Sequence, residues 1–115
     1  MIVVPFPPSA NRMWRAVHGT VKVSEQGREF RERAEIALAV QHIEKLEGPV
    51  SVRIIVYFPN RRGDLDNRIK PLLDVLEGWC FKNDSQVHHL DVTRAIDKDA
   101  PRAEVWAMRW AEGAM

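Results

Sequence analysis

The sequence predicts a small single domain of the α/β (α+β) class, in which two main helices pack on a mixed β-sheet. Its 115 residues fit one domain, over residues 1–115, and its 45% hydrophobic and 29% charged residues are those of an ordinary globular protein. Segments with the two-residue period of strands alternate with segments that have a helical period. The resulting order of strand, helix, strand, helix and two strands favours helices layered on one sheet.

The N-terminal segment is predicted to form a short strand and a hairpin. Ile2 to Phe6 is an apolar run that ends at Pro7, since proline lacks the N–H group that a strand ladder uses. Trp14 to Val17 and Thr20 to Val23 flank a His-Gly pair. Glycine supplies the positive φ that a two-residue hairpin turn needs, so we expect these two segments to pair.

A long helix is predicted from about Glu25 to Leu46. Ser24 is a suitable N-cap, because its hydroxyl can accept a hydrogen bond from a free N–H group of the first turn. Gly48 and Pro49 end the helical pattern. Apolar side chains recur at helical spacing between charged ones, and we expect this stripe to face the core: Phe30, Ala34, Ala37, Leu38 and Ile43.

The clearest strand is Val50 to Phe58. Apolar residues occupy every second position of this segment, which predicts one wholly buried face. The next segment carries a helical apolar stripe from Ile69 to Leu76, with Pro71 inside it. Because proline is tolerated only in the first turn of a helix, this helix is predicted to begin near Asn67, with Asp66 or Asn67 as its cap.

The C-terminal part is predicted to add two strands. Glu77 to Asp84 is a connector, and Gln86 to Ile96 and Ala103 to Trp110 have strand patterns joined by a polar turn. Alternating large apolar side chains on the last strand indicate a buried or dimer-facing sheet surface, with base stacking as the alternative: Trp106, Met108 and Trp110.

Two carboxylates, Asp64 and Asp66, lie one residue apart in the loop between the central strand and the second helix. The loop reads RRGDLDNRIK, from Arg61 to Lys70, and Asp84 follows the helix on the connector. Mg²⁺ prefers hard oxygen ligands, usually a few carboxylates together with waters and phosphate oxygens. The three carboxylates therefore predict a Mg²⁺ site. The alternative is that Asp66 only caps the helix and that Asp64 lies in the turn.

Other classes of protein and site are excluded by composition. Cys80 is the only cysteine, which excludes an intrachain disulfide and a Cys-rich zinc site. No apolar run can span a bilayer and the N-terminus lacks a signal-sequence pattern, so we expect a cytoplasmic protein with no membrane partner. We also expect no small-molecule cofactor. The net charge of +1 gives no argument for nucleic acid by itself.

The motifs resemble those of a known family. The run GDLDNRIKPLLDVLEG, followed by NDSQV, closely resembles the RusA family of Holliday-junction resolvases. The opening VPFPPSANRMWR is similar to the N-terminal signature of that family. The resemblance covers roughly Ile2 to Ile96. It implies a Mg²⁺-dependent endonuclease of bacteria, phages and prophages that acts as a homodimer on four-way DNA junctions.

The resemblance also implies roles for individual residues. The metal-binding acids of the family correspond to Asp64, Asp66 and Asp84, and its catalytic lysine corresponds to Lys70. Many members carry two acids in the last motif, whereas Asn83 precedes Asp84 in this chain. Asp84 is therefore the one candidate for the third ligand.

Lys70 suits the chemistry of phosphodiester cleavage. The reaction needs an activated water and neutralisation of charge on the phosphate, which carboxylate-bound Mg²⁺ can supply. A lysine can add a fixed positive charge at the developing pentacovalent phosphate or at the attacking water. The alternative is an exposed helix lysine that pairs with Asp74 at i+4.

The arginines of the loop are predicted to contact DNA. Arg61, Arg62 and Arg68 would follow the phosphate backbone near the cleaved bond. The alternative is a solvated loop in which they balance the charge of the two carboxylates. Asn11 and Arg12, in the loop after the first strand, are further candidates for this site.

Together these features predict a homodimeric endonuclease that binds four-way junctions and cuts two opposed strands in DNA recombination and repair. A two-fold dimer presents two equivalent sites to a quasi-symmetric junction. Two alternatives stay open. One is a dimer that binds junctions without cleaving them, and the other is a metal-dependent phosphoesterase that acts on branched or single-stranded DNA.

Overall fold

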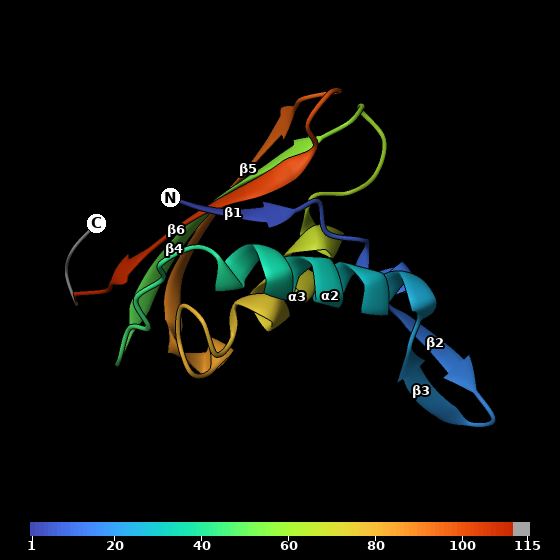
Figure 1. The fold of residues 1–115 in the computed structure, drawn as a ribbon, viewed down its shortest axis with the longest axis horizontal. Coiled ribbons are helices and arrows are strands. Elements are labelled where there is room, and N and C mark those ends of the chain that lie inside the picture. Colours follow the sequence, from blue (N-terminus) through green and yellow to red (C-terminus); the bar gives the residue numbers. More distant parts are fainter. Residues whose placement is uncertain (112–115) are drawn as a thin grey trace.

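A four-stranded mixed sheet is the frame of the molecule (Figure 1). In this computed structural model, which describes residues 1–111, the strands lie in the order β1 (Ile2–Pro5), β6 (Arg102–Arg109), β4 (Val50–Phe58) and β5 (Val87–Ile96). β4 pairs in parallel with β5, and the other two pairings are antiparallel. The predicted mixed sheet is confirmed.

Two long helices pack on one face of this sheet, as predicted (Figure 1). They are α2 (Glu25–Ala39) and α3 (Asp66–Leu76). α3 is the crossover that the parallel pair β4 and β5 requires, because parallel strands cannot be joined by a tight turn. None of the helices in the described part of the chain is long and apolar enough to cross a membrane.

Three short elements complete the fold. α1 (Ala10–Met13) is a single helical turn, and η1 (Asp84–Gln86) is a 3₁₀ turn that leads into β5. The hairpin of β2 (Trp14–Val17) and β3 (Thr20–Val23) projects from one end of α2 (Figure 1). His18 and Gly19 both have positive φ, of 50° and 78°, which confirms the predicted two-residue turn.

The core lies between the sheet and the two long helices. Every second side chain of β4, from Val50 to Phe58, is fully buried, which confirms the predicted alternation. The Ser24 hydroxyl accepts a hydrogen bond from Gly27 N–H at 3.0 Å, so the predicted N-cap of α2 is confirmed as well. The helices fill the other side of the core with the side chains of Phe30, Ala34, Leu38, Leu72, Val75 and Leu76.

The predicted C-terminal end of the first long helix is wrong. The sequence pattern extends to Leu46, but α2 ends at Ala39. The Gln41 side chain accepts a hydrogen bond from Val3 N–H at 2.8 Å and donates one to Val3 O at 2.7 Å. This amide takes the place of a neighbouring strand at the free edge of β1, which holds the chain at Gln41 in a non-helical path.

Replacement of Gln41 by alanine tests this edge contact. We expect Gln41→Ala to lower the free energy of unfolding by about 1 kcal/mol, because two backbone groups of Val3 lose their protein partner. Urea unfolding followed by circular dichroism measures the change. Gln26→Ala, at an exposed position of α2, is the matched control. Equal midpoints for the two variants would contradict the proposed role of Gln41.

Candidate functional site

The loop that follows β4 is held from the neighbouring strand by Arg94. The Arg94 guanidinium donates to Gly63 O at 2.6 Å and to the carbonyl oxygens of Asn60 and Arg62, each at 3.1 Å. It also lies 3.8 Å from the centroid of the Phe58 ring. Three carbonyl groups of one loop therefore converge on one charged side chain, and this fixes the path of the chain toward Asp64.

Gly63 lets the loop pass close to α3. Its φ of 87° lies in the left-handed region, where a side chain is disfavoured. A Cβ atom at this position would lie 2.9 Å from Nη2 of Arg68, so a larger residue would also displace that guanidinium. Both constraints favour glycine immediately before Asp64.

Asp64 and Asp66 lie at the start of α3, but neither caps it. The predicted cap at Asp66 or Asn67 is wrong: Leu65 is the N-cap residue, and its backbone is already helical, with φ of −63° and ψ of −47°. A capping side chain needs an extended backbone, and none occurs here. Asp66 Oδ1 accepts the N–H of Asn67 at 3.0 Å, and the Asn67 side chain donates to Asp64 Oδ2 at 3.4 Å. Asn67 therefore contacts both exposed carboxylates.

One face of α3 carries a row of charged side chains. Asp66, Lys70 and Asp74 follow one another at intervals of four residues, which places them on the same side of the helix, and Glu77 follows at the C-cap position. Lys70 Nζ lies 2.7 Å from Asp84 Oδ2 and 3.0 Å from Asp74 Oδ1. The hydrogen bond to Asp84, and then the one to Asp74, raise the pKa of Lys70 above its ordinary value. Lys70 is thus a cation in contact with two carboxylates.

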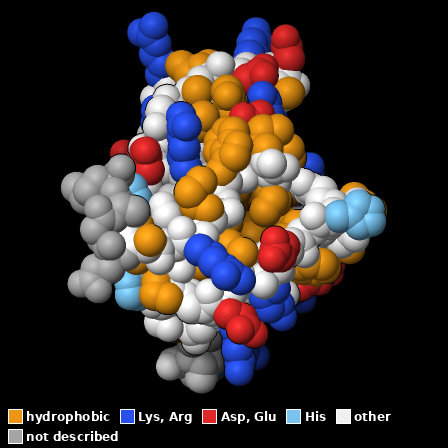
Figure 2. All heavy atoms as spheres, turned by 90° about the vertical axis from the view of Figure 1, so that its left-hand side faces the viewer, with side chains coloured by type: hydrophobic (Ala, Val, Ile, Leu, Met, Phe, Trp, Pro, Cys, Tyr) orange, Lys and Arg blue, Asp and Glu red, His pale blue; other side chains and the backbone are white. Residues whose placement is uncertain are grey.

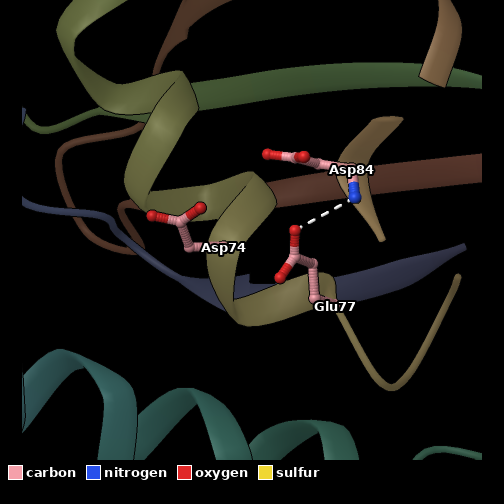
Figure 3. A group of neighbouring side chains, drawn as sticks. All are labelled: Asp74, Glu77 and Asp84. Atoms are coloured by element: carbon pink, nitrogen blue, oxygen red, sulfur yellow. Dashed lines mark hydrogen bonds between the residues drawn. The ribbon is translucent and has the colours of Figure 1, made fainter. Parts of the chain in front are cut away.

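Asp84 is positioned by the turn that contains it. The Asn83 side chain accepts the N–H of Ser85 at 2.8 Å, and Gln86 closes a capping box on the same turn. Glu77 Oε1 accepts the N–H of Asp84 at 3.0 Å (Figure 3). The Asn83 position, which departs from the family pattern, therefore shapes the backbone, while Asp84 presents its carboxylate to Lys70.

Three carboxylates gather at the C-terminal end of α3. Oxygen atoms of Asp74, Glu77 and Asp84 lie within 4.8 Å of one another, and all three side chains are half-buried. Figure 3 shows Asp74 and Glu77 projecting from α3, with Asp84 facing them from the turn before β5. Oxygen ligands at this spacing are suited to a divalent cation. Asp64 and Asp66 are not members of this close group in the described residues.

The predicted site residues thus fall into two sets that share α3. Asn67 joins the carboxylates of Asp64 and Asp66 at the start of the helix, and Lys70 contacts Asp84 farther along it. The alternative interpretation of Lys70, an exposed helix lysine that pairs with Asp74 at i+4, is confirmed, and its catalytic role stays a prediction. Sequence reasoning missed that Asp74 and Glu77 lie close to Asp84. Their spacing of four and seven residues from Lys70 could have indicated that they lie on the same side as the lysine.

A pocket of about 410 Å³ opens beside Asp64. It lies between the segment after β1 and the loop after β4, and it contains Asn11 and Arg12 as well as Arg62 and Arg68. The two residues proposed from the N-terminal segment therefore reach the same hollow as the acidic loop. Arg61 is exposed outside this pocket.

Arg68 is more enclosed than the other arginines of the loop. Its Nη1 donates to Pro7 O at 2.9 Å, and its guanidinium lies over the rings of Phe6 and Phe58, at 4.8 and 5.6 Å from their centroids. Burial, followed by the charges of Arg12 and Arg94, lowers the pKa of Arg68. Arg68 therefore joins the N-terminal segment to α3 in addition to lining the pocket.

Residues 5–107 of the chain match a family model that is described as "Endodeoxyribonuclease RusA". The chain belongs to the RusA family. Among its RusA relatives, the crossover junction endodeoxyribonuclease of Escherichia coli strain K12 is 35% identical over 89 residues, which cover 75% of this chain and 74% of the relative. The enzyme of the same name from Enterobacteria phage HK97 is 30% identical over 97 residues, with 82% and 81% covered. That of Enterobacteria phage 82 is 34% identical over 89 residues.

Membership of the RusA family confirms the resemblance inferred from the acidic motifs. The matched region, residues 5–107, includes the loop after β4, α3, the turn at Asp84 and most of β6. The family is one of endodeoxyribonucleases, which agrees with the enzyme class predicted from the sequence.

Sequence reasoning missed Arg94 as the anchor of the acidic loop, and proteolysis can test this role. We expect Arg94→Met to make trypsin cleavage after Arg61 and Arg62 several-fold faster, because the loop carbonyls lose their donor and the loop opens more often. Mass spectrometry of the fragments measures the rate. Arg53→Met is a matched control, since Arg53 lies over the Trp106 ring on the same sheet. Equal cleavage rates in the two variants would contradict the anchoring role.

Proposed function

We propose that this RusA-family chain is a Mg²⁺-dependent endodeoxyribonuclease that resolves four-way DNA junctions. It makes paired, symmetric nicks in two opposed strands during recombination and repair. The observation that carries the proposal is the arrangement along α3, where family-motif carboxylates border a lysine that is held by Asp84. We further propose that residues 1–115 form one nuclease domain, which acts in the cytoplasm without a small-molecule cofactor.

Asp64, Asp66 and Asp84 are the proposed Mg²⁺ ligands. Their oxygen donors suit this cation, and Asp74 and Glu77 add carboxylates beside Asp84. Bound Mg²⁺ would supply an activated water and neutralise charge on the phosphate. The exposed positions of Asp64 and Asp66 support the proposal, because a cation held there would be open to a DNA phosphate without any rearrangement of the core.

Lys70 is the proposed catalytic lysine. Its ammonium group is fixed between Asp84 and Asp74, so its charge is oriented before DNA arrives. A preorganised cation stabilises the developing charge of the phosphate without a further cost for reorientation. Arg61 and Arg62 are exposed and would follow the DNA backbone, while Arg68 would contribute from its more enclosed position.

We propose a homodimer that forms through the face of the sheet opposite the helices. Ile55 and Tyr57 on β4 and Trp106 and Met108 on β6 share this face by register and alternation. Figure 2 shows hydrophobic side chains gathered on one side of the molecule, with charged ones around them. Aromatic residues, methionine and arginine are enriched at protein interfaces, and Arg53 lies over Trp106 here.

The metal ligands can be tested by removing one charge at a time. We expect Asp64→Asn and Asp66→Asn each to slow junction cleavage by roughly 100-fold or more, because charge stabilisation by a held metal is worth several kcal/mol. Gel-shift binding of the junction should persist or tighten, since repulsion of phosphate falls. Asp99→Asn, in an exposed turn, is the matched control. Near wild-type cleavage by either loop variant would overturn the assignment.

The dimer face can be tested by introducing a charge. We expect Trp106→Glu to convert the dimer to a monomer, because a buried unpaired carboxylate is costly in an interface. Light scattering after size-exclusion chromatography measures the mass. Ile36→Glu, on the exposed side of α2, is the control. A dimer that survives Trp106→Glu but dissociates with Ile36→Glu would move the interface to α2.

A further inference from the structure

The pocket beside Asp64 holds more positive than negative charge. Arg12, Arg62 and Arg68 line it, and Asp64 is the one carboxylate among its lining residues. Elsewhere on the sheet Arg102 pairs with Asp97 at 2.8 Å and with Glu104 at 3.1 Å. Within residues 1–111, no such ion pair involves the three arginines of the pocket. Their charge is left for an external anion to balance.

Repulsion between these cations makes an anion more favourable. Arg12 and Arg94 both act on Arg68 with like charge, and Asp64 offsets them only in part. In the described part of the chain the Nε–H of Arg68 is buried and has no hydrogen-bond partner. Guanidinium groups held close together bind phosphate well, because each offers planar N–H donors that match its oxygen atoms.

The lining favours a phosphate group over a base. Phe6 and Phe58 meet edge to face, with centroids 5.2 Å apart, and a guanidinium group lies over each ring. Phe58 is fully buried and Arg68 occupies one face of Phe6, so the rings leave little surface on which a base could stack. The remaining lining is rich in neutral polar groups, which come from Ser9, Asn11, Asn60 and Asn67.

We propose that this pocket binds a backbone phosphate of the DNA strand next to the phosphate that is cleaved, with Arg12 and Asn11 as binding residues. The inference rests on the proposed function for the identity of the anion as DNA. Asp64 lines the pocket and also belongs to the proposed metal site, so the two phosphates would lie side by side along one strand. The segment after β1 thereby becomes part of the DNA-binding surface.

Salt dependence of binding tests the contact without any cleavage. A synthetic four-way junction is titrated with protein in EDTA over a range of salt concentrations. We expect Arg12→Gln to weaken binding and to reduce the slope of log K against log salt by about 1, as loss of one phosphate contact requires. Asn11→Ala should weaken binding with little change in slope, because an amide carries no charge.

Arg109→Gln is the matched control for charge. Arg109 pairs with Val50 at the end of β4 opposite Phe58, roughly 26 Å from the pocket by strand rise. We expect this variant to keep the wild-type slope. Arg12 is exposed, so Arg12→Gln should keep its fold, which its thermal midpoint measured by circular dichroism checks.

Neutral phosphates locate the contact on DNA. Junctions that carry a single methylphosphonate near the cleaved bond are compared for wild type and Arg12→Gln. We expect one position to weaken wild-type binding and to have no further effect on the variant. An unchanged slope for Arg12→Gln, or equal sensitivity of both proteins at every position, would overturn the proposal. Binding of inorganic phosphate alone, with an unchanged DNA slope, would also overturn it.

The same measurements distinguish the phosphate-binding pocket from the nuclease activity. If the wild type cleaves junctions but Arg12→Gln keeps the wild-type salt slope, the proposed function stands and the phosphate-binding pocket is wrong. If Arg12→Gln has the reduced slope but the wild type never cleaves junctions, the pocket stands and the proposed function is wrong. A wild type that binds no junction at all would overturn both.

Discussion

The parallel pairing of β4 with β5 determines where the candidate carboxylates and Lys70 lie. Parallel strands need a crossover, and α3 provides it with its apolar side buried against β4. The opposite side of α3 must then face outward, and it carries the row from Asp66 to Asp74, with Glu77 at the C-cap. The loop that enters the helix bears Asp64, and the turn that leaves toward β5 bears Asp84. The site is thus a direct consequence of the crossover.

The charges around α3 contribute little to the stability of the fold. The Lys70 side chain is 61% exposed, and ion pairs at such exposure are typically worth less than about 1 kcal/mol. The stability of the fold therefore does not explain the row of acids around Lys70. The pocket with Arg12 and Arg68 is also lined by Asp64, so the proposed contacts to DNA and the proposed metal ligands share one loop.

Local features of this fold were predictable, whereas features that depend on tertiary contacts were not. Alternation identified β4, and Pro71 placed the start of α3 within one residue. The end of α2 depends on a contact between Gln41 and Val3 of β1, which are 38 residues apart in the sequence. The spacing of apolar residues cannot predict such a distant contact. Arg94 lies on β5, 31 residues after Gly63, and anchors the acidic loop from there. The only sequence signal for this contact was a charged residue at a position of β5 that faces the helices. The grouping of Asp74 and Glu77 with Asp84 likewise appears only when the turn before β5 folds back on α3.

The most direct test of the central claim is strand-by-strand mapping of the products from a mobile four-way junction. Each strand is labelled in turn, and the junction is incubated with the protein in Mg²⁺ or in EDTA, beside duplex, flap and single-stranded DNA. We predict nicks at symmetric positions in two opposed strands of the junction, only when Mg²⁺ is present. Cleavage that is confined to flaps or single strands, or that persists in EDTA, would contradict a metal-dependent junction resolvase.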